Sequence, residues 1–261
     1  MSAVVAEPLV HHTRSAGVLT LTMARAPVNA LDDALVDALE AALEAACADG
    51  EIKVVHLRSA CRVFCAGADL ALMAQSIATP QGLDRMLALV ARLQRLGARL
   101  EAAPVVTLAE IGGAALGGGF ELALACDLRI AAHEAKLGLP EAGLGLLAAA
   151  GGTQRLTRLV GPGVARRLIL GAETVDGAGA ERLGLVQWAL PRAGLAEAAR
   201  ALAERIAALP REALGAAKQC IAAALDQSRD GFAEEIAHTR HLYQHPATQA
   251  LVAAFLARAP R

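Results

Sequence analysis

Gly112-Gly113-Ala114-Ala115-Leu116-Gly117-Gly118-Gly119-Phe120-Glu121 is the stretch around which the chain is organised. Its glycines surround a short apolar link, and a carboxylate follows at once. A second carboxylate, Glu141, lies in the mostly apolar sequence that runs on to Leu147. Bare backbone N–H groups suit an oxyanion, and carboxyl groups in apolar surroundings can move protons near neutral pH. The stretch therefore predicts acid/base chemistry beside an anion site.

Composition predicts one sizeable core in one or two domains. The chain has 261 residues, of which 55% are hydrophobic and only 2% aromatic, so the core must be built from Ala, Leu, Val and Ile. The formal net charge is −1 and no basic run occurs, which argues against nucleic acid as a partner.

The five cysteines are too few and too scattered for a disulfide scaffold, and Cys61 and Cys65 have no second pair to complete a zinc site. We expect no metal. The first eight residues lack the pattern of a secretory signal, and no apolar run reaches about 18 uninterrupted residues. We therefore expect a cytoplasmic protein that has no membrane partner.

The first sixty residues read as strand, helix, strand. Residues 18–23 alternate β-branched and aliphatic side chains, and residues 53–59 (Lys-Val-Val-His-Leu-Arg-Ser) are predicted to form the next strand. Between them Asp32 or Asp33 can cap a helix that continues to about Cys47. This order predicts that the two strands are parallel.

A small-residue loop over 64–70 follows the second strand, and an amphipathic helix is predicted over about 81–100. Residues 104–111 are predicted to form a third strand that is apolar on both faces, as in a buried parallel sheet. The glycine-rich stretch comes next. We then expect a helix over 120–125 and an extended segment over 127–132.

The second half is predicted to be loop-like over 138–147 and helical from Gly151. From Pro162 onward it is helical apart from a short apolar run at 186–190, and Pro210 and Pro246 mark helix starts. The chain thus divides into an α/β core over 1–190 and a helical part over 191–261. No linker rich in Gly, Ser or Pro separates them, so the helices should pack on the core or on a neighbouring subunit.

The two glycine loops have an alternative interpretation as tight turns. They do not match the spaced G-x-G-x-x-G fingerprint well, and no phosphate-binding P-loop motif occurs. Glu121 is more telling, because a Glu in an apolar run is usually on a surface or paired, yet its neighbours here are all apolar. If it is buried, its pKa should rise, and it should titrate together with a nearby Glu141.

Four ordered motifs resemble the enoyl-CoA hydratase/isomerase (crotonase) superfamily, and most closely its enoyl-CoA hydratases. They are Phe64-Cys65-Ala66-Gly67-Ala68-Asp69, the run from Gly117 to Asp127, Pro140-Glu141-Ala142-Gly143-Leu144-Gly145, and Gly151-Gly152-Thr153-Gln154-Arg155-Leu156. The resemblance extends from Val18 to Phe255. It implies an α/β fold of the ClpP/crotonase type, a spiral of ββα units followed by a C-terminal helical trimerisation region.

The resemblance also implies the site. Members bind an acyl-CoA thioester and stabilise its enolate with two backbone N–H groups, here those of Ala68 and Gly118. Glu121 would orient and deprotonate a water, and Glu141 would protonate the α-carbon. The residues implied to contact the substrate or its CoA part are Arg25, Ala26, Val28, Ala66, Ala68, Asp69, Leu70, Gly117 and Gly118.

Some positions depart from the family pattern, and they concern the CoA phosphates rather than the thioester. The stretch from Arg25 to Leu31 is one residue shorter than the family's R-P-x-x-x-N-A-L and lacks its lysine. Ala71 stands where a basic residue is common, and Ala148-Ala149-Ala150 replaces Pro-Gly-Ala. The basic C-terminal tail is reduced to Arg258 and Arg261.

Retention of both acids favours syn hydration of a 2-enoyl-CoA to a 3-hydroxyacyl-CoA, a lyase reaction of fatty-acid β-oxidation or related acyl-CoA catabolism. No cofactor is expected, because CoA is part of the substrate, and a homotrimer or a hexamer of two trimers is implied. The alternatives are double-bond isomerisation, a specialised acyl-CoA hydratase, or a non-catalytic acyl-CoA-binding member. His238, His241 and His245 could share one helical face as a metal site, but a solvated face is commoner.

Overall fold

The computed structural model describes residues 7–258. Its main sheet has six strands in the order β1-β2-β3-β4-β6-β9. Their bounds are Val10–Ser15 (β1), Val18–Met23 (β2), Val54–Ser59 (β3), Val106–Ile111 (β4), Leu128–Ala132 (β6) and Trp188–Leu190 (β9). The hairpin of β1 with β2 is antiparallel, and every other pairing in this sheet is parallel. The predicted parallel pairing of the strands at 18–23 and 53–59 is confirmed.

A second, smaller sheet has the order β5-β7-β8. Its strands are Ala115–Leu116 (β5), Lys136–Gly138 (β7) and Thr174–Asp176 (β8). β5 lies inside the glycine-rich stretch and pairs in parallel with β7. The glycine-rich stretch is thereby fixed from both sides, because β4 of the main sheet precedes it and β5 anchors its middle.

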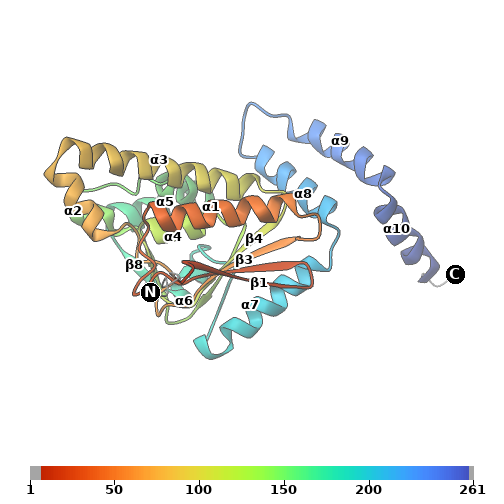
Figure 1. The fold of residues 1–261 in the computed structure, drawn as a ribbon. Helices are drawn as coiled ribbons and strands as arrows, with labels where there is room; N and C mark the ends of the chain where they lie inside the picture. The colour runs from red at the N-terminus through yellow and green to blue at the C-terminus, as the bar shows by residue number, and fades with distance from the viewer. Residues whose placement is uncertain (1–6, 259–261) are drawn as a thin grey trace.

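Helices cover the two faces of the main sheet (Figure 1). On one face α1 (Asp33–Ala48) and α3 (Pro80–Ala102) lie side by side. The short helix α2 (Leu70–Ala78) directly precedes α3 and packs against it. On the other face α7 (Arg192–Ala207) packs against β2, β3, β4 and β6. Burial on both faces explains why β4 is buried at each of its positions.

The core is aliphatic, as the composition predicts, with two informative exceptions. Phe64 and Phe120 are fully buried; Phe64 begins the loop at 64–70, and Phe120 lies at the end of the glycine-rich stretch. The other largest fully buried side chains are Met23, Leu31, Leu35, Leu43, Ile52, Leu89, Leu96, Leu108, Ile111 and Leu137. A large buried ring next to each loop thus anchors that loop in the core.

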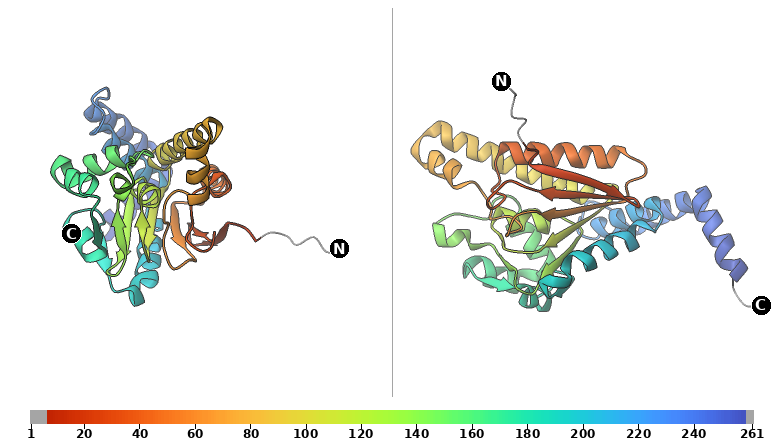
Figure 2. Two further views of the ribbon diagram at one scale, coloured as in Figure 1. Left: turned by 90° about the vertical axis from the view of Figure 1, so that its left-hand side faces the viewer. Right: turned by 60° about the horizontal axis from the view of Figure 1, so that its bottom comes forward.

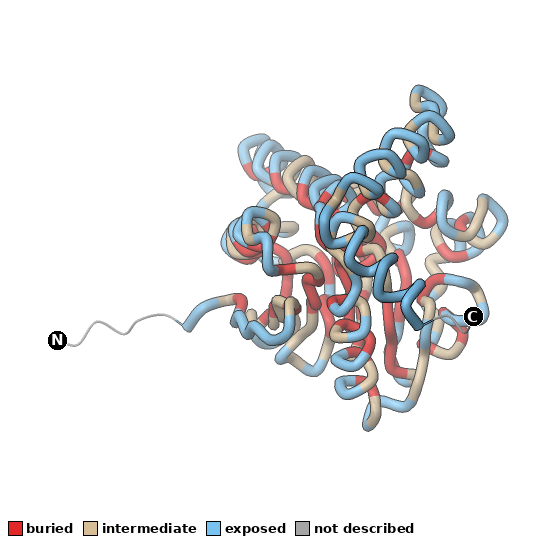
Figure 3. The backbone as a smooth tube through the Cα atoms, turned by 90° about the vertical axis from the view of Figure 1, so that its right-hand side faces the viewer, coloured by how far each residue is buried: buried red, intermediate tan, exposed pale blue. Residues whose placement is uncertain are grey.

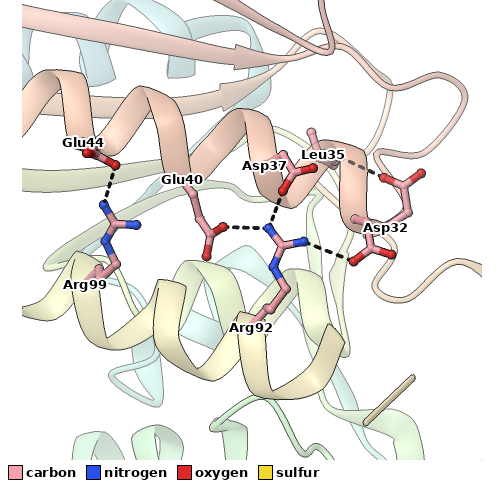
Figure 4. Close-up of polar contacts among 8 residues, drawn as sticks. Asp32, Leu35, Asp37, Glu40, Glu44, Arg92 and Arg99 are labelled. Carbon is pink, nitrogen blue, oxygen red and sulfur yellow. Dashed lines mark hydrogen bonds and ion pairs between the residues drawn. The ribbon is translucent and has the colours of Figure 1, made fainter. Parts of the chain in front are cut away.

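Caps and ion pairs fix the helices on the first face. Asp32 caps α1 by accepting from Leu35 N at 2.9 Å, as the sequence predicts. Arg92 of α3 reaches Asp37 and Glu40 of α1 at 2.5 and 2.7 Å (Figure 4). Three charged groups in one cluster hold the two helices in a defined register.

The sequence did not predict α2. Residues 70–78 continue directly from the loop at 64–70, and the side chain of Asp69 caps them by accepting from Ala71 N and Leu72 N. A nine-residue helix is too short to show a clear period of its own, so its stability comes from this cap and from packing on α3.

Three elements that follow β5 carry the second half of the site. They are α4 (Gly118–Leu124), the 3₁₀-helix η1 (Pro140–Leu144) and α5 (Gly152–Leu170). α5 is kinked at Gly161, whose φ of 76° interrupts the helix just before Pro162. The short α6 (Gly177–Arg182) then leads back to β9.

The chain ends in α8 (Arg211–Ala223), α9 (Gly231–Gln244) and α10 (Pro246–Arg258). The predicted helix starts at Pro210 and Pro246 are confirmed. α9 and α10 project away from the rest of the molecule and contain no buried residue (Figures 2 and 3). Their large exposed hydrophobic side chains are Phe232, Ile236, Tyr243, Leu251, Val252, Phe255 and Leu256. Division of the chain at residue 190 stays a prediction, and α7 packs on the sheet rather than with α9 and α10.

None of the helices between residues 7 and 258 combines the length and the apolar character needed to cross a membrane.

Candidate active site

The two glycine-containing loops meet at one place. Cys65 forms an isolated parallel bridge with Ala115, and Leu31 forms another with Ala68. A Cβ atom on Gly67 would lie 3.0 Å from Leu116 O, and Gly67 adopts a φ of +95°. Only glycine fits this contact without strain, and the chain needs it there because two backbone segments pass each other.

Two backbone N–H groups come together at this meeting point. The nitrogen of Ala68 lies 3.8 Å from the position that a Cβ atom on Gly118 would occupy. Gly118 is the first residue of α4, where N–H groups have no partner within the helix. Within residues 7–258, neither the Ala68 nor the Gly118 N–H donates a backbone hydrogen bond. Both donors predicted by the resemblance are therefore free to bind an oxyanion.

Glu121 lies in the first turn of α4 and is 4% exposed. Its Oε1 accepts from the backbone N–H of Gly152, at the start of α5, at 2.7 Å. Its pKa is raised to about 7, mainly by burial and to a smaller extent by the nearby charge of Glu141. This carboxyl group can exchange a proton near neutral pH, as the sequence predicts for a buried Glu121.

Glu141 lies on η1, and its carboxylate rests against the bare Cα of Gly117. A Cβ atom on Gly117 would lie 2.8 Å from Glu141 Oε1. Glu141 Oε2 is buried and has no hydrogen-bond partner between residues 7 and 258. Burial raises the pKa of Glu141 as well. A buried carboxyl oxygen without a partner is costly, which is typical of a group that acts on a ligand.

The donor pair and the acid pair belong to one small site. Gly117 contacts Glu141 and directly precedes Gly118, and Gly118 approaches Ala68. The arrangement can hold a developing negative charge on an oxygen while two carboxyl groups transfer protons next to it. The four residues come from the loop at 64–70, from α4 and from η1, so no single segment of the chain contains the site.

Arg25 forms ion pairs with two carboxylates. Its Nη2 lies 2.8 Å from Asp32 Oδ2 and 3.0 Å from Asp69 Oδ2. These aspartates cap α1 and α2, and Asp69 directly follows Ala68. The structure therefore places Arg25 as a link between the two caps beside the predicted oxyanion site.

The remaining predicted contact residues lie around the same loops. Val28 O accepts from Ala66 N at 3.0 Å, which joins the loop around Ala26 to the first glycine-containing loop. Ala66 is exposed. Leu70 begins α2, and its side chain lies outside the described part of the chain. Contact of these residues with CoA stays a prediction.

Asn29 is a residue of the site region that sequence reasoning did not select. It is fully buried with a φ of 50°, and its Nδ2 donates to Ser59 Oγ at 2.7 Å and to Phe64 O at 2.9 Å. Its Oδ1 accepts from Arg25 N at 2.9 Å. Asn29 thereby ties the loop containing Arg25 to the end of β3. In the sequence it is the Asn of the stretch from Arg25 to Leu31 that resembles the family pattern R-P-x-x-x-N-A-L.

Among residues 7–258, no group of three or more His, Cys, Asp or Glu side chains is arranged to hold a metal ion. The rings of His241 and His245 lie 6.4 Å apart on exposed turns at the end of α9. Cys65 is buried, which raises the pKa of its thiol to about 12. It is therefore a packing residue rather than a nucleophile.

Comparison with known proteins identifies the family. The family model for enoyl-CoA hydratase/isomerase matches residues 13–259. The 2,3-dehydroadipyl-CoA hydratase of Escherichia coli is 40% identical over 210 residues, which are 80% of this chain and 80% of that protein. A Bacillus subtilis protein named as an enoyl-CoA hydratase/isomerase is 46% identical over 147 residues, and the match spans only 55% of its length.

A solved structure gives the same result. The enoyl-CoA hydratase of Bacillus anthracis superposes with a TM-score of 0.87 and 32% identity, over 97% of this chain and 98% of that one. The predicted crotonase fold is confirmed, although its trimerisation region is not tested by a single chain. A match over nearly all residues and a shared fold lead to one conclusion: the chain belongs to the enoyl-CoA hydratase/isomerase family.

Proposed function

We propose that the protein is an enoyl-CoA hydratase, which adds water syn to a 2-enoyl-CoA and releases a 3-hydroxyacyl-CoA. The observation that supports this most strongly is the pair Glu121 and Glu141, both with raised pKa, beside the free N–H groups of Ala68 and Gly118. Hydration needs a base, an acid and a site for negative charge, and these four residues supply all three.

The thioester oxygen would bind between the N–H groups of Ala68 and Gly118. When water attacks the β-carbon, the electrons of the double bond move toward the thioester, and its oxygen gains negative charge. The two donors are fixed before the reaction, by the contact of Gly67 with Gly118 and by the bridge of Leu31 with Ala68. Loss of one such donor typically costs about 3 kcal/mol of transition-state stabilisation.

The two acids would divide the proton transfers. Glu121 takes a proton from the water as the new C–O bond forms at the β-carbon. Glu141 gives a proton to the α-carbon, which closes the enolate back to a thioester. No electrons enter or leave, so we propose that the reaction uses no cofactor and that CoA arrives as part of the substrate.

The CoA part would lie along the loops of residues 25–28 and 66–70. This part of the proposal rests on the resemblance of these loops to the family motifs, and it includes Arg25, Ala26, Val28, Ala66, Asp69, Leu70 and Gly117. Arg25 contributes there while it is paired with Asp32 and Asp69.

We further propose that the chain forms a homotrimer, or a hexamer of two trimers. The exposed apolar side chains of α9 and α10 support this, since helices with no buried residue are stabilised by packing on another surface. A place in fatty-acid β-oxidation and in the cytoplasm stays a prediction. Sedimentation of the full chain tests the assembly, and a monomer at micromolar concentration would overturn it.

Product analysis on crotonyl-CoA and on longer 2-enoyl-CoAs tests the proposed reaction. A 3-hydroxyacyl-CoA product is the expected result. A shifted double bond would instead assign an isomerase, and binding of acyl-CoA without turnover would assign a non-catalytic member. Either of these two outcomes would overturn the proposal.

A further inference from the structure

Arg155 makes a three-point contact outside the set of residues assigned above. It lies in the first turns of α5, and its Nε and Nη2 donate to the two carboxylate oxygens of Glu101, each at 2.9 Å. Its Nη1 donates to the carbonyl oxygen of Ala150 at 3.0 Å. The bidentate pair fixes the plane of the guanidinium group, so the third contact fixes the carbonyl of Ala150 relative to α3.

Two glycines lie directly against this guanidinium group, at positions where a larger residue would clash with it. A Cβ atom on Gly97 of α3 would lie 2.7 Å from Arg155 Nη2, and one on Gly151 would lie 2.1 Å from Nη1. Gly151 also has a φ of +111°. The Arg155 side chain is only 11% exposed. Two glycines from distant parts of the chain thus leave a space that the guanidinium group fills.

The segment that Arg155 holds is the one that contacts Glu121. Ala150, Gly151 and Gly152 form the turn into α5, and Gly152 N donates to Glu121 Oε1 at 2.7 Å. The backbone N–H of Ala150, in the same turn, also acts on the Glu121 carboxylate and lowers its pKa. The orientation of Glu121 therefore depends on where this backbone turn lies.

We propose that Arg155 and Glu101 are positioning residues for Glu121, which act by fixing the Ala150–Gly152 turn against α3. Neither residue touches the acid itself. The catalytic consequence rests on the proposed hydratase function, whereas the structural consequence, an ordered Gly152 N–H, does not. If the turn moves, Glu121 loses its donor and the alignment of its carboxylate.

Arg155 acts on Glu121 in two ways that the experiment must separate. It fixes the Ala150–Gly152 turn, and its positive charge lowers the pKa of Glu121. The other groups that act on Glu121 are the charge of Glu141 and the N–H groups of Ala150 and Gly152. Removal of Glu101 distinguishes the effects by sign. Loss of its negative charge alone would lower the pKa of Glu121, whereas loss of the Gly152 donor would raise it.

The experiment compares Arg155→Met and Glu101→Ala with Arg167→Met as a matched control. Arg167 is on the same helix and forms the same kind of bidentate pair, with Glu173 at 2.8 and 2.6 Å, but this pair is exposed and contacts no part of the turn. The first measurement is amide hydrogen exchange at Gly152 in the full-length protein without substrate. The second is the pH profile of kcat/KM for hydration.

We expect faster exchange at Gly152 in Arg155→Met and in Glu101→Ala, with no change in Arg167→Met. We also expect kcat to fall about tenfold in the first two variants, because a small misplacement of a catalytic group has an effect of this order or larger. The pKa that limits the acid side of the profile should rise in Glu101→Ala. Unchanged exchange at Gly152, or a lower limiting pKa in Glu101→Ala, would overturn the inference. Wild-type protein without hydratase activity would overturn the proposed function alone, since the exchange measurement still decides the inference.

Discussion

Gly67 and Gly118 are in contact across the site, so that a Cβ atom on Gly67 would lie 3.3 Å from the backbone nitrogen of Gly118. Gly67 belongs to the loop after β3, and Gly118 begins α4. The contact brings the two free N–H groups, of Ala68 and Gly118, close together. Because Gly67 has no side chain, the two donors can come close enough to bind a single oxygen.

Gly67→Ala should therefore raise the activation free energy of the reaction by more than it lowers the free energy of unfolding. The new methyl group meets Leu116 O at 3.0 Å and Gly118 N at 3.3 Å, and the φ of +95° adds strain of about 1–3 kcal/mol. Steady-state kinetics and thermal unfolding together measure the two effects. Gly163→Ala is the control, because a Cβ atom there meets nothing within 4 Å. Normal kcat in Gly67→Ala would contradict the assignment of the donors.

Glu121→Gln and Glu141→Gln should each reduce kcat by about 10²- to 10⁴-fold, the range typical of general acid or base groups. The substitutions keep the size of each side chain and remove only its ability to transfer a proton. The check is the initial rate of hydration under saturating substrate. Glu197→Gln on the exposed side of α7 should be fully active. Full activity in Glu141→Gln would exclude it as the proton donor.

The pH profile of kcat/KM should be bell-shaped. Glu121 must be ionised to act as a base, so the rate should rise with pH through about 7, the value to which burial raises its pKa. Glu141 must be protonated to act as an acid, so the rate should fall once pH exceeds its own raised pKa. The two limiting values belong to the coupled pair.

Glu121→Gln should be more stable than the wild type at pH 8, despite its loss of activity. The pKa of Glu121 is about 7 in the folded protein, against an ordinary value of 4.5 for a glutamic acid, so folding favours the protonated form. The wild type therefore loses stability as pH rises from about 4.5 to 7, while the Gln variant does not. The expected gain at pH 8 is about 1–3 kcal/mol.

Denaturant unfolding at pH 5 and at pH 8 measures this gain. The difference between variant and wild type should be small at pH 5, where Glu121 is mostly protonated in the folded state. Equal differences at the two pH values would show that the folded protein does not hold Glu121 in its neutral form. Such a result would remove the physical basis for its role near neutral pH.

Arg25→Met should reduce kcat on a short thioester that lacks the nucleotide as well as on a CoA thioester. The reason is that Arg25 joins the caps of α1 and α2 through Asp32 and Asp69, next to Ala68. A loss of about tenfold is expected from the displaced donor. Crotonyl-N-acetylcysteamine and crotonyl-CoA provide the comparison, and Arg14→Met, which breaks the exposed pair with Asp49, is the control.

An additional rise in KM with crotonyl-CoA alone would measure the predicted contact of Arg25 with CoA. Unchanged kinetics with crotonyl-N-acetylcysteamine would show that the link between the two caps does not position the donor at Ala68.

Much of the fold follows from local patterns in the sequence. The strand patterns at β3 and β4, the cap at Asp32 and the prolines at 210 and 246 each act on neighbouring residues, so their structures could be predicted. The helix α2 was missed because its stability comes from α3 and from Asp69 rather than from its own period. The short strands β5, β7 and β8 were missed because two or three residues form a strand only when a partner is present.

The sequence by itself determined which groups are present: two acids in apolar surroundings, two loops rich in glycine and the order of the main strands. Only the tertiary structure decided how they meet. Ala68 approaches Gly118, Gly152 donates to Glu121, and Arg25 pairs with Asp32 and Asp69 through contacts between residues far apart in the chain. Local sequence patterns do not encode such distances, and the pKa of a carboxyl group depends on them, because burial and neighbouring charges are properties of the folded state.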